Sequence, residues 1–380
     1  PPVLVVGTYL DSRCGRTPDA PAGCTNSGAA HVYVLSAPGG TWAWNGTLKP
    51  AAAKANTRCG LGVAIAGDLV AVGCPFDPSP STAVDFGEAL TSGSVVGSAH
   101  VWRLNGANAS ASGREAYLKA FRAADAQAFG NTVAVAANGT YEVVAVSAGS
   151  SRTGAPYGDL NGNLAMAFDV AVSGGGQFDE GEVTTFVHDV AGGRWRPLHR
   201  VKAPVGLVSE QFGRTLSAGV TASGSFVLGI GTLVGCRGYF VTLPMALALR
   251  RETPPSMAMM SNTSGACPTA TTDMTTSVAL NALDPSGPVL LTLHSGQSTT
   301  KDAAYRYAAD GAMLLDGPRW TSSSTGGHVH STSIGFAGRV AVIGQQGEDY
   351  QRSVWMNGTE AGGVTDVGAV VIHTGVGVGG

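Results

Sequence analysis

Short runs of alternating apolar and polar residues recur along the chain, separated by turns rich in Gly, Asn and Asp. The clearest segment is 63–72 (VAIAGDLVAV), in which two apolar runs flank the turn Gly67-Asp68. Period-two runs around a Gly-Asp turn predict a β-hairpin. After a loop, 99–104 and 115–121 supply two further runs. Residues 59–121 therefore predict one four-stranded up-and-down antiparallel sheet.

The same order of runs recurs along the whole chain, and the differences in spacing fall in the loop between the second and third strands. In the fourth repeat the last strand is expected at 247–250. Repetition of a four-stranded unit favours a β-propeller. We predict an all-β fold, a β-propeller of four-stranded antiparallel blades that forms a single domain over 1–380. Six repeats are visible, seven if one is hidden, with approximate bounds 1–55, 56–125, 126–205, 206–252, 265–322 and 328–380.

Composition and charge exclude several classes of protein. Charged residues make up only 13% of the chain and Gly occurs 55 times, which favours turns and strands over helices. A net charge of −3 leaves no basic face for nucleic acid or an anionic membrane. No apolar run reaches the roughly 18 residues that a membrane span needs. The chain has no initial Met and no signal-peptide pattern, which indicates a processed or partial product.

Six cysteines fall into three close pairs, and we predict nearest-neighbour bridges. The middle pair brackets the 63–72 hairpin, whose two ends should lie near each other. Free buried thiols or a zinc site are the alternatives, although no CxxC occurs. Disulfides indicate an oxidising compartment, so the expected location is extracellular or at the cell surface. The predicted bridges are Cys14–Cys24, Cys59–Cys74 and Cys236–Cys267.

The chain also carries five N-glycosylation sequons, at Asn45, Asn108, Asn138, Asn262 and Asn357. Three of these five are Asn-Gly pairs, which favour turns and would place a glycan at the surface. A Thr or Ser that simply suits a turn is the alternative interpretation. We expect N-linked glycans on at least some of them.

The order FG-x-x-V-A, a hairpin, V-x-V-G-x-P, a loop and G-x-x-x-V-Y resembles the FG-GAP repeat. That repeat builds the β-propeller of integrin α-subunits and of many secreted microbial and algal proteins. The resemblance implies a propeller fold and says little about function, because propellers host many activities. The matching residues are Phe129-Gly130, Phe212-Gly213, 70–75, 339–344 and the strands at 28–35 and 97–104, with Gly-Gly-x-Trp at 39–42 and 192–195.

Many FG-GAP repeats bind calcium between their first two strands through spaced acidic residues. The corresponding turns in this chain are too short and too poor in carboxylates to offer the six or more oxygens that calcium prefers. The one partial match is Asp159, Asn161 and Asn163, in a different loop, which an ordinary Asn-Gly turn explains equally well. No other metal and no cofactor is predicted.

No nucleophile elbow, HExxH motif, phosphate loop or dinucleotide fingerprint occurs. Three further clusters have both a chemical and an ordinary interpretation. The first could hold a metal or be a turn, the second could do acid–base chemistry or be a solvated rim, and the third could face an acidic partner or a sugar ring or protect a sheet edge. These clusters are His328 with His330, Asp179-Glu180 with Glu182, and the arginine groups 194–196 (around Trp195) and 250–252.

These observations lead to the prediction of a non-catalytic extracellular structural or adhesive glycoprotein, not an enzyme. Its partners would be copies of itself or other extracellular glycoproteins, and it would self-assemble into a filament through its loops and termini. The alternative is a carbohydrate-binding or carbohydrate-active propeller that uses its central funnel. It needs acids, Arg and aromatic residues at one mouth of the channel, and a pocket that joins three or more of Asp77, Asp85, Glu88, Asp179 and Glu348 would favour it. The loops expected to carry contacts are 11–27, 76–96, 150–179, 253–275 and 349–364.

Overall fold

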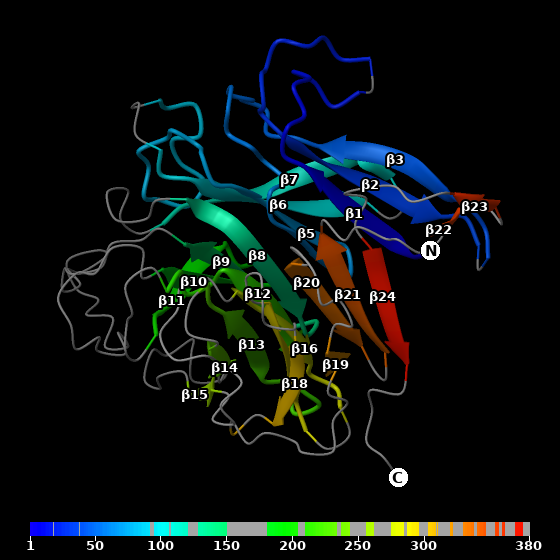
Figure 1. Ribbon diagram of the computed structural model, residues 1–380. Coiled ribbons are helices and arrows are strands. Elements are labelled where there is room, and N and C mark those ends of the chain that lie inside the picture. Colours follow the sequence, from blue (N-terminus) through cyan, green and yellow to red (C-terminus); the bar gives the residue numbers. More distant parts are fainter. Residues whose placement is uncertain are drawn as a thin grey trace, which may run out of the picture. The chain divides into compact units, whose positions relative to one another are not determined.

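The computed structural model is an all-β protein built of successive antiparallel sheets (Figure 1). Within the residues it describes, no helix has the length and apolar character needed to cross a membrane. The described residues are 1–17, 19–37, 39–91, 95–105, 108–120, 128–149, 181–203, 210–233, 237–243, 256–261, 275–284, 287–295, 303–308, 310, 320–321, 330–337, 340–346, 354–356, 359–361 and 369–374.

The strands belong to two compact units. The first unit contains β1 (Val3–Thr8), β2 (Ala29–Leu35), β3 (Trp42–Leu48), β4 (Val63–Ala66), β5 (Leu69–Cys74), β6 (Ser98–Asn105), β7 (Asn108–Leu118), β8 (Phe129–Ala137), β9 (Tyr141–Ala148), β10 (Glu182–Asp189) and β11 (Arg196–Val201). The second unit contains β12 (Thr215–Val220), β13 (Phe226–Gly231), β14 (Arg237–Leu243), β15 (Ser256–Ser261), β16 (Thr275–Asn281), β17 (Val289–Ser295), β18 (Ala303–Ala308), β19 (Trp320–Thr321), β20 (His330–Ala337), β21 (Val340–Gln346), β22 (Val354–Met356), β23 (Thr359–Ala361) and β24 (Ala369–Thr374).

In both units the sheets are up-and-down and antiparallel. The first unit has the sheets β1-β2-β3, β4-β5-β6-β7 and β8-β9-β10-β11, here named the first, second and third sheets. The second unit has β12-β13-β14-β15, β16-β17-β18-β19 and β20-β21-β24, and the hairpin β22-β23. The predicted fold class, an all-β protein of four-stranded antiparallel sheets of the β-propeller type, is confirmed.

Two segments differ from the sequence-based expectation. The last strand of the fourth repeat, expected at 247–250, is observed as β15 at Ser256–Ser261, inside a segment expected to be a loop. The hairpin β22-β23 likewise lies inside the expected loop 349–364. Neither segment shows a clean alternation of apolar and polar residues, so the sequence does not predict a strand there. Pairing with a neighbouring strand fixes the extended conformation instead.

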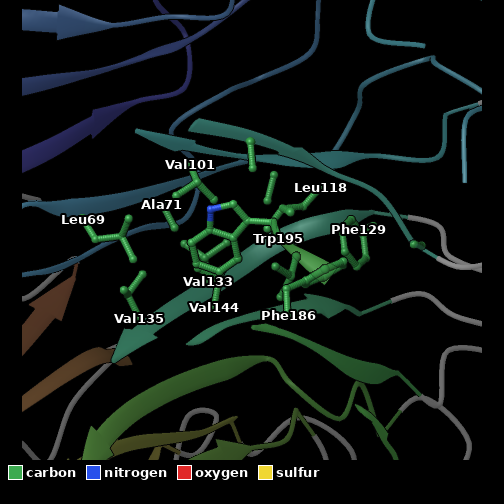
Figure 2. Close-up of a cluster of buried hydrophobic side chains, with 14 of the residues drawn as sticks. Leu69, Ala71, Val101, Leu118, Phe129, Val133, Val135, Val144, Phe186 and Trp195 are labelled. Carbon is green, nitrogen blue, oxygen red and sulfur yellow. The ribbon is translucent and has the colours of Figure 1, made fainter. Parts of the chain in front are cut away.

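The core of the first unit consists of two apolar layers between consecutive sheets. One layer joins the first and second sheets through Val32, Val70, Val72 and Trp102, against which Val5 packs. The other joins the second and third sheets (Figure 2). Each inner strand is thus apolar on both sides, and all six residues of β5 are buried.

The phenylalanine of each Phe-Gly pair bridges to a glycine of the preceding sheet. Gly97 and Gly181, just before the third strand of their sheets, form parallel bridges with Phe129 and Phe212, both fully buried. A Cβ added to Gly130 would lie 2.1 Å from the carbonyl oxygen of Ser98, and its φ of +95° is a conformation that suits glycine. Cys59 takes the place of phenylalanine at the start of the second sheet, where it bridges to Gly28.

Candidate functional site

The outer face of the first sheet carries large apolar side chains that are open to solvent. Leu4 of β1 pairs directly with Tyr33 of β2, which pairs with Trp44 of β3. Directly paired residues share a face of the sheet, and Trp42, two residues before Trp44, lies on the same face. Leu4, Trp42 and Trp44 are 43%, 46% and 42% exposed. An exposed apolar patch of this kind is typical of an interaction surface.

Repeat comparison shows which of these aromatic residues the fold itself requires. Tyr33 occupies the position of Trp102 in the second sheet, where the indole is fully buried against the first sheet. Trp44 pairs with Tyr33, whereas the residue paired with Trp102 is Arg114. An indole at position 44 is therefore not part of the packing scheme of the repeat.

The aromatic face ends in a polar row formed by His31 and Thr47, which pair directly. His31 Nδ1 lies 2.9 Å from Thr47 Oγ1, and His31 Nε2 lies 3.1 Å from Arg13 Nη2. A guanidinium can only donate, so Nε2 accepts and the imidazole proton on Nδ1 donates to Thr47. Burial, followed by the charge of Arg13, lowers the pKa of His31, which keeps the ring neutral.

Asp11 and Arg13 continue this row beyond the ends of the strands. Asp11 Oδ2 accepts hydrogen bonds from Arg13 Nε, at 2.9 Å, and from Arg13 Nη2. Lys49 Nζ lies 3.4 Å from Asp11 Oδ1 and donates to the carbonyl of Gly28 at 2.8 Å. Burial alone would raise the pKa of Asp11, but the hydrogen bonds from Arg13 and the charge of Lys49 outweigh it and lower the pKa to about 2. Asp11 is therefore a permanent carboxylate.

Arg13 connects the polar row with the aromatic face. The pKa of Arg13 is raised, first by its hydrogen bond to Asp11 and further by the charge of Asp11. Arg13 contacts His31, which lies two residues before Tyr33 on the same face of β2. A third cation, Arg16, donates from Nε to the carbonyl of Lys49 at 3.1 Å. We call the set Asp11, Arg13, Arg16, His31 and Lys49 the first polar cluster.

The second sheet repeats this cluster at equivalent positions, but in a closed form. Lys119, like Lys49, directly follows the last strand of its sheet, and it donates to the carbonyls of Gly97 and of Ser79, the latter at 2.8 Å. The Tyr117 hydroxyl donates to the Asp77 carboxylate, and Tyr117, Lys119 and His100 are all buried. Burial lowers the pKa of Lys119 to about 8 and that of His100 to about 4. This second cluster holds loop and strands together and has no open side chain to offer a ligand.

The candidate acids of the β5–β6 loop are each engaged by groups of the protein. Asp77 belongs to the buried second cluster. Asp85 Oδ1 accepts a hydrogen bond from the backbone N–H of Tyr117 at 2.7 Å, and Glu88 is paired with Arg114. Each of these carboxylates is bound to protein groups, so they do not form a pair free for acid–base work. Asp179 and Glu348 lie outside the described residues.

The remaining sequence-based candidates are only partly within the described chain. Glu182 is buried and paired with Arg200. Trp195 is only 5% exposed and stacks on His188 with ring centroids 5.3 Å apart, so the interpretation of 194–196 as a surface for a sugar ring is wrong for its indole. No group of three or more His, Cys, Asp or Glu in the described part of the chain could hold a metal. Asp159, Asn161, Asn163, Asp179-Glu180, His328 and 250–252 lie outside the described residues.

Two of the three predicted disulfides are observed, Cys14–Cys24 and Cys59–Cys74. Cys236 and Cys267 lie outside the described residues, as do Asn262 and Asn357. Asn138 is exposed in the β8–β9 turn, Asn45 is half-buried in β3, and Asn108 is the first residue of β7.

Comparison with known proteins gives distant structural likenesses only. No protein-family model and no curated protein sequence matches the chain. An exo-β-1,3-galactanase from Clostridium thermocellum matches with a TM-score of 0.35 and 9% identity, over 75% of this chain and 54% of the galactanase. An ulvan lyase of polysaccharide lyase family PL25, bound to its -[GlcA(1-4)Rha3S]- saccharide, matches with a TM-score of 0.39 and 9% identity, over 92% of this chain and 70% of the lyase. A Pyrococcus horikoshii acylaminoacyl peptidase matches with a TM-score of 0.34 and 9% identity, over 88% of this chain and 48% of the peptidase.

These likenesses correct the functional expectation. The galactanase and the lyase are carbohydrate-active enzymes, which contradicts the predicted non-catalytic structural or adhesive protein and agrees better with the carbohydrate alternative. The chain spans about half the length of the galactanase and of the peptidase it matches.

The sequence did not predict the first polar cluster or the exposed aromatic face of the first sheet. Arg13 and Trp44 are separated by a disulfide-closed loop and a strand, and neither stands in a known motif. One signal was present: Lys49, Lys119 and Lys202 each follow the last strand of their sheet, and all three are buried. A buried lysine at a repeated position indicates a repeated partner.

Proposed function

We propose that this protein is a secreted carbohydrate-active protein that holds polysaccharide chains on the outer face of its first sheet. The observation that carries the proposal is Trp44, an exposed indole paired directly with Tyr33 at a position where the second sheet has Arg114. We take a polysaccharide to be what covers this ring, as the first sheet covers the equivalent face of the second sheet.

The chemistry of the face suits a sugar chain. A pyranose ring has an apolar face of C–H groups, and the electron-rich face of an indole attracts such polarised hydrogens. Trp42 and Trp44 stand two residues apart on one strand, on the order of 7 Å, so neighbouring rings of one chain can contact both. Next to them His31 and Thr47 are buried and bonded to each other, and His31 also contacts Arg13, so they fix the edge of this face.

Retention of the protein in native gels cast with dissolved polysaccharides tests the proposal. We expect Trp44→Ala and Trp42→Ala to weaken binding about tenfold each, because stacking on an aromatic ring contributes about 0.5–1.5 kcal/mol beyond buried area. Phe86→Ala is the matched control, since Phe86 is 66% exposed but lies on the β5–β6 loop. The same polysaccharides are assayed for released reducing ends and unsaturated products.

Binding that is unchanged in Trp44→Ala would show that the rest of the molecule, not a ligand, covers this face. No retention by any polysaccharide would overturn the proposal altogether.

Three finer expectations accompany this proposal. Extracellular location is supported by the two observed disulfides, which form in oxidising compartments. N-linked glycans are supported by the exposure of Asn138 in a turn. Membership of the FG-GAP repeat class is supported by the buried Phe129 and Phe212, which tie consecutive sheets together.

A further inference from the structure

We propose that the polysaccharide held on this face is acidic, and that Arg13 binds a carboxylate or sulfate group of the sugar. The inference rests on the proposed function and adds the chemical class of the ligand. Two observations support it: Arg13 has hydrogen-bond donors without a partner in the described chain, and the groups around it carry an excess of positive charge.

Arg13 has one edge of its guanidinium in use and one edge open. Its Nε and Nη2 donate to Asp11, and Nη2 also contacts His31. Within the described part of the chain Nη1 has no partner, and the side chain is 31% exposed. The planar guanidinium fork matches the geometry of a carboxylate or a sulfate, which could accept from the Nη1 edge.

The charges of the first polar cluster do not balance. Arg13, Arg16 and Lys49 are three cations, and Asp11 is the one carboxylate that lies within ion-pair distance of any of them in the described chain. His31 is neutral, as argued above. A net positive site on a chain whose total charge is −3 favours an anionic ligand at this point of the surface.

Arg13 is also held in place before any ligand arrives. Asp11 fixes the plane of the guanidinium through two hydrogen bonds, and a backbone bridge joins Arg13 to Ala22. The neighbouring Cys14–Cys24 disulfide closes the same loop. Because little conformational freedom remains to be lost, binding of an anion here costs less than at a mobile surface arginine.

The position of Arg13 relates the charge to the aromatic rings. His31 and Tyr33 lie two residues apart on the same face of β2, and Arg13 contacts the first of them. A sugar ring stacked on Tyr33 and Trp44 therefore presents a ring substituent toward Arg13. Lys49 is fully buried and contributes charge, while Arg13 makes the contact.

The test compares three forms of one polysaccharide: a uronate polymer, its carboxyl-reduced neutral form, and the sulfated neutral form. We expect the wild-type protein to bind at least one acidic form about tenfold more tightly than the neutral form at low salt, with the difference shrinking at high salt. The uronate and sulfate arms identify which anion is preferred. Equal binding of all three forms by the wild type would overturn the inference.

Three variants locate the preference. Arg13→Gln should remove it while leaving neutral-polymer binding, and Arg13→Lys, which keeps the charge but not the fork, should retain part of it. Arg214→Gln, at an exposed arginine just before β12, is the control and should change nothing. Circular dichroism checks that each variant is folded, and the wild-type comparison stands even if Arg13→Gln is not. If the protein binds the neutral polymer through Trp44 but shows no preference for the acidic forms, only the inference is rejected. If it binds no polymer at all, the proposed function is rejected as well.

Discussion

At the scale of residues, the chain repeats one buried ion cluster in two states. In the second sheet Lys119 and Asp77 are sealed beneath Tyr117, whereas in the first sheet Thr47 stands at the equivalent position and leaves room for Arg13 beside His31. Both clusters cost desolvation energy, and removing one ion from either leaves the charge of its partner uncompensated. The difference between a structural cluster and a candidate binding site is thus the size of one side chain.

The Asp11 carboxylate should make stability depend on pH in the acid range. Its folded pKa is about 2, below its ordinary value of 3.8, so its contribution is complete above about pH 4 and is lost as pH falls toward 2. We expect about 1–2 kcal/mol from this group at pH 7 after allowance for partial solvent screening. Urea unfolding of Asp11→Asn should therefore show a lower stability than wild type at pH 7 and a smaller loss between pH 4 and 2. The exposed Asp19→Asn should follow the wild type, and an Asp11→Asn curve parallel to wild type would contradict the assignment.

At the scale of elements, the joint between consecutive sheets depends on glycines that admit a neighbouring backbone. Gly130 faces the carbonyl of Ser98, and Gly73 in turn faces the carbonyl of Gly130, where an added Cβ would lie 1.8 Å away. The Phe-Gly pair thus combines a buried ring with a close backbone contact. This explains why apolar strands ending in glycine alternate with Phe-Gly pairs along the sequence.

Gly130→Ala tests this joint against an ordinary turn glycine. The new methyl group would collide with the Ser98 carbonyl in a backbone conformation that already disfavours it, so we expect a loss of about 3 kcal/mol or more. Gly67→Ala, in the β4–β5 turn, has a φ of +63° but no atom within 4 Å, and should cost only about 1–2 kcal/mol. Urea midpoints of the two variants measure the difference. Equal midpoints would mean that the joint relaxes freely.

At the scale of the whole molecule, the described disulfides and the sequon at Asn138 are the features that support the proposed secretion. Cys14–Cys24 closes the loop that begins directly after Arg13, and Cys59–Cys74 ties the start of the second sheet to the end of β5. A chain with few charges and many exposed turns gains solubility from surface glycans. These features fit a protein that meets polysaccharides outside the cell.

Glycan occupancy can be read from variants of one turn. Asn138 Oδ1 accepts from the backbone N–H groups of Thr140 and Tyr141, which holds the sequon in an exposed turn. In a eukaryotic secretory host we expect Asn138→Gln to lose the mass of one glycan by intact-mass measurement. Thr140→Ala keeps the asparagine but destroys the sequon, and should lose the same mass. An unchanged mass in both variants would show that this asparagine is not modified.

The sequence by itself determined the local features of this protein: the 63–72 hairpin, the repeated four-stranded units and the bridges Cys14–Cys24 and Cys59–Cys74. These features depend on apolar–polar alternation, turn residues and cysteines close in sequence. All three act locally and do not depend on which sheet packs against the strand. Only the tertiary structure decided the rest. Gly-Gly-x-Trp places Trp42 and Trp195 at the same point of their repeats, yet Trp195 is buried and Trp42 is exposed. Asp11 and Lys49 meet across 38 residues, and the strand Ser256–Ser261 forms where the pattern predicts a loop. The physical reason is that periodicity tells which face of a strand is apolar, whereas the sheet that covers this face, or leaves it to a ligand, comes from a distant part of the chain.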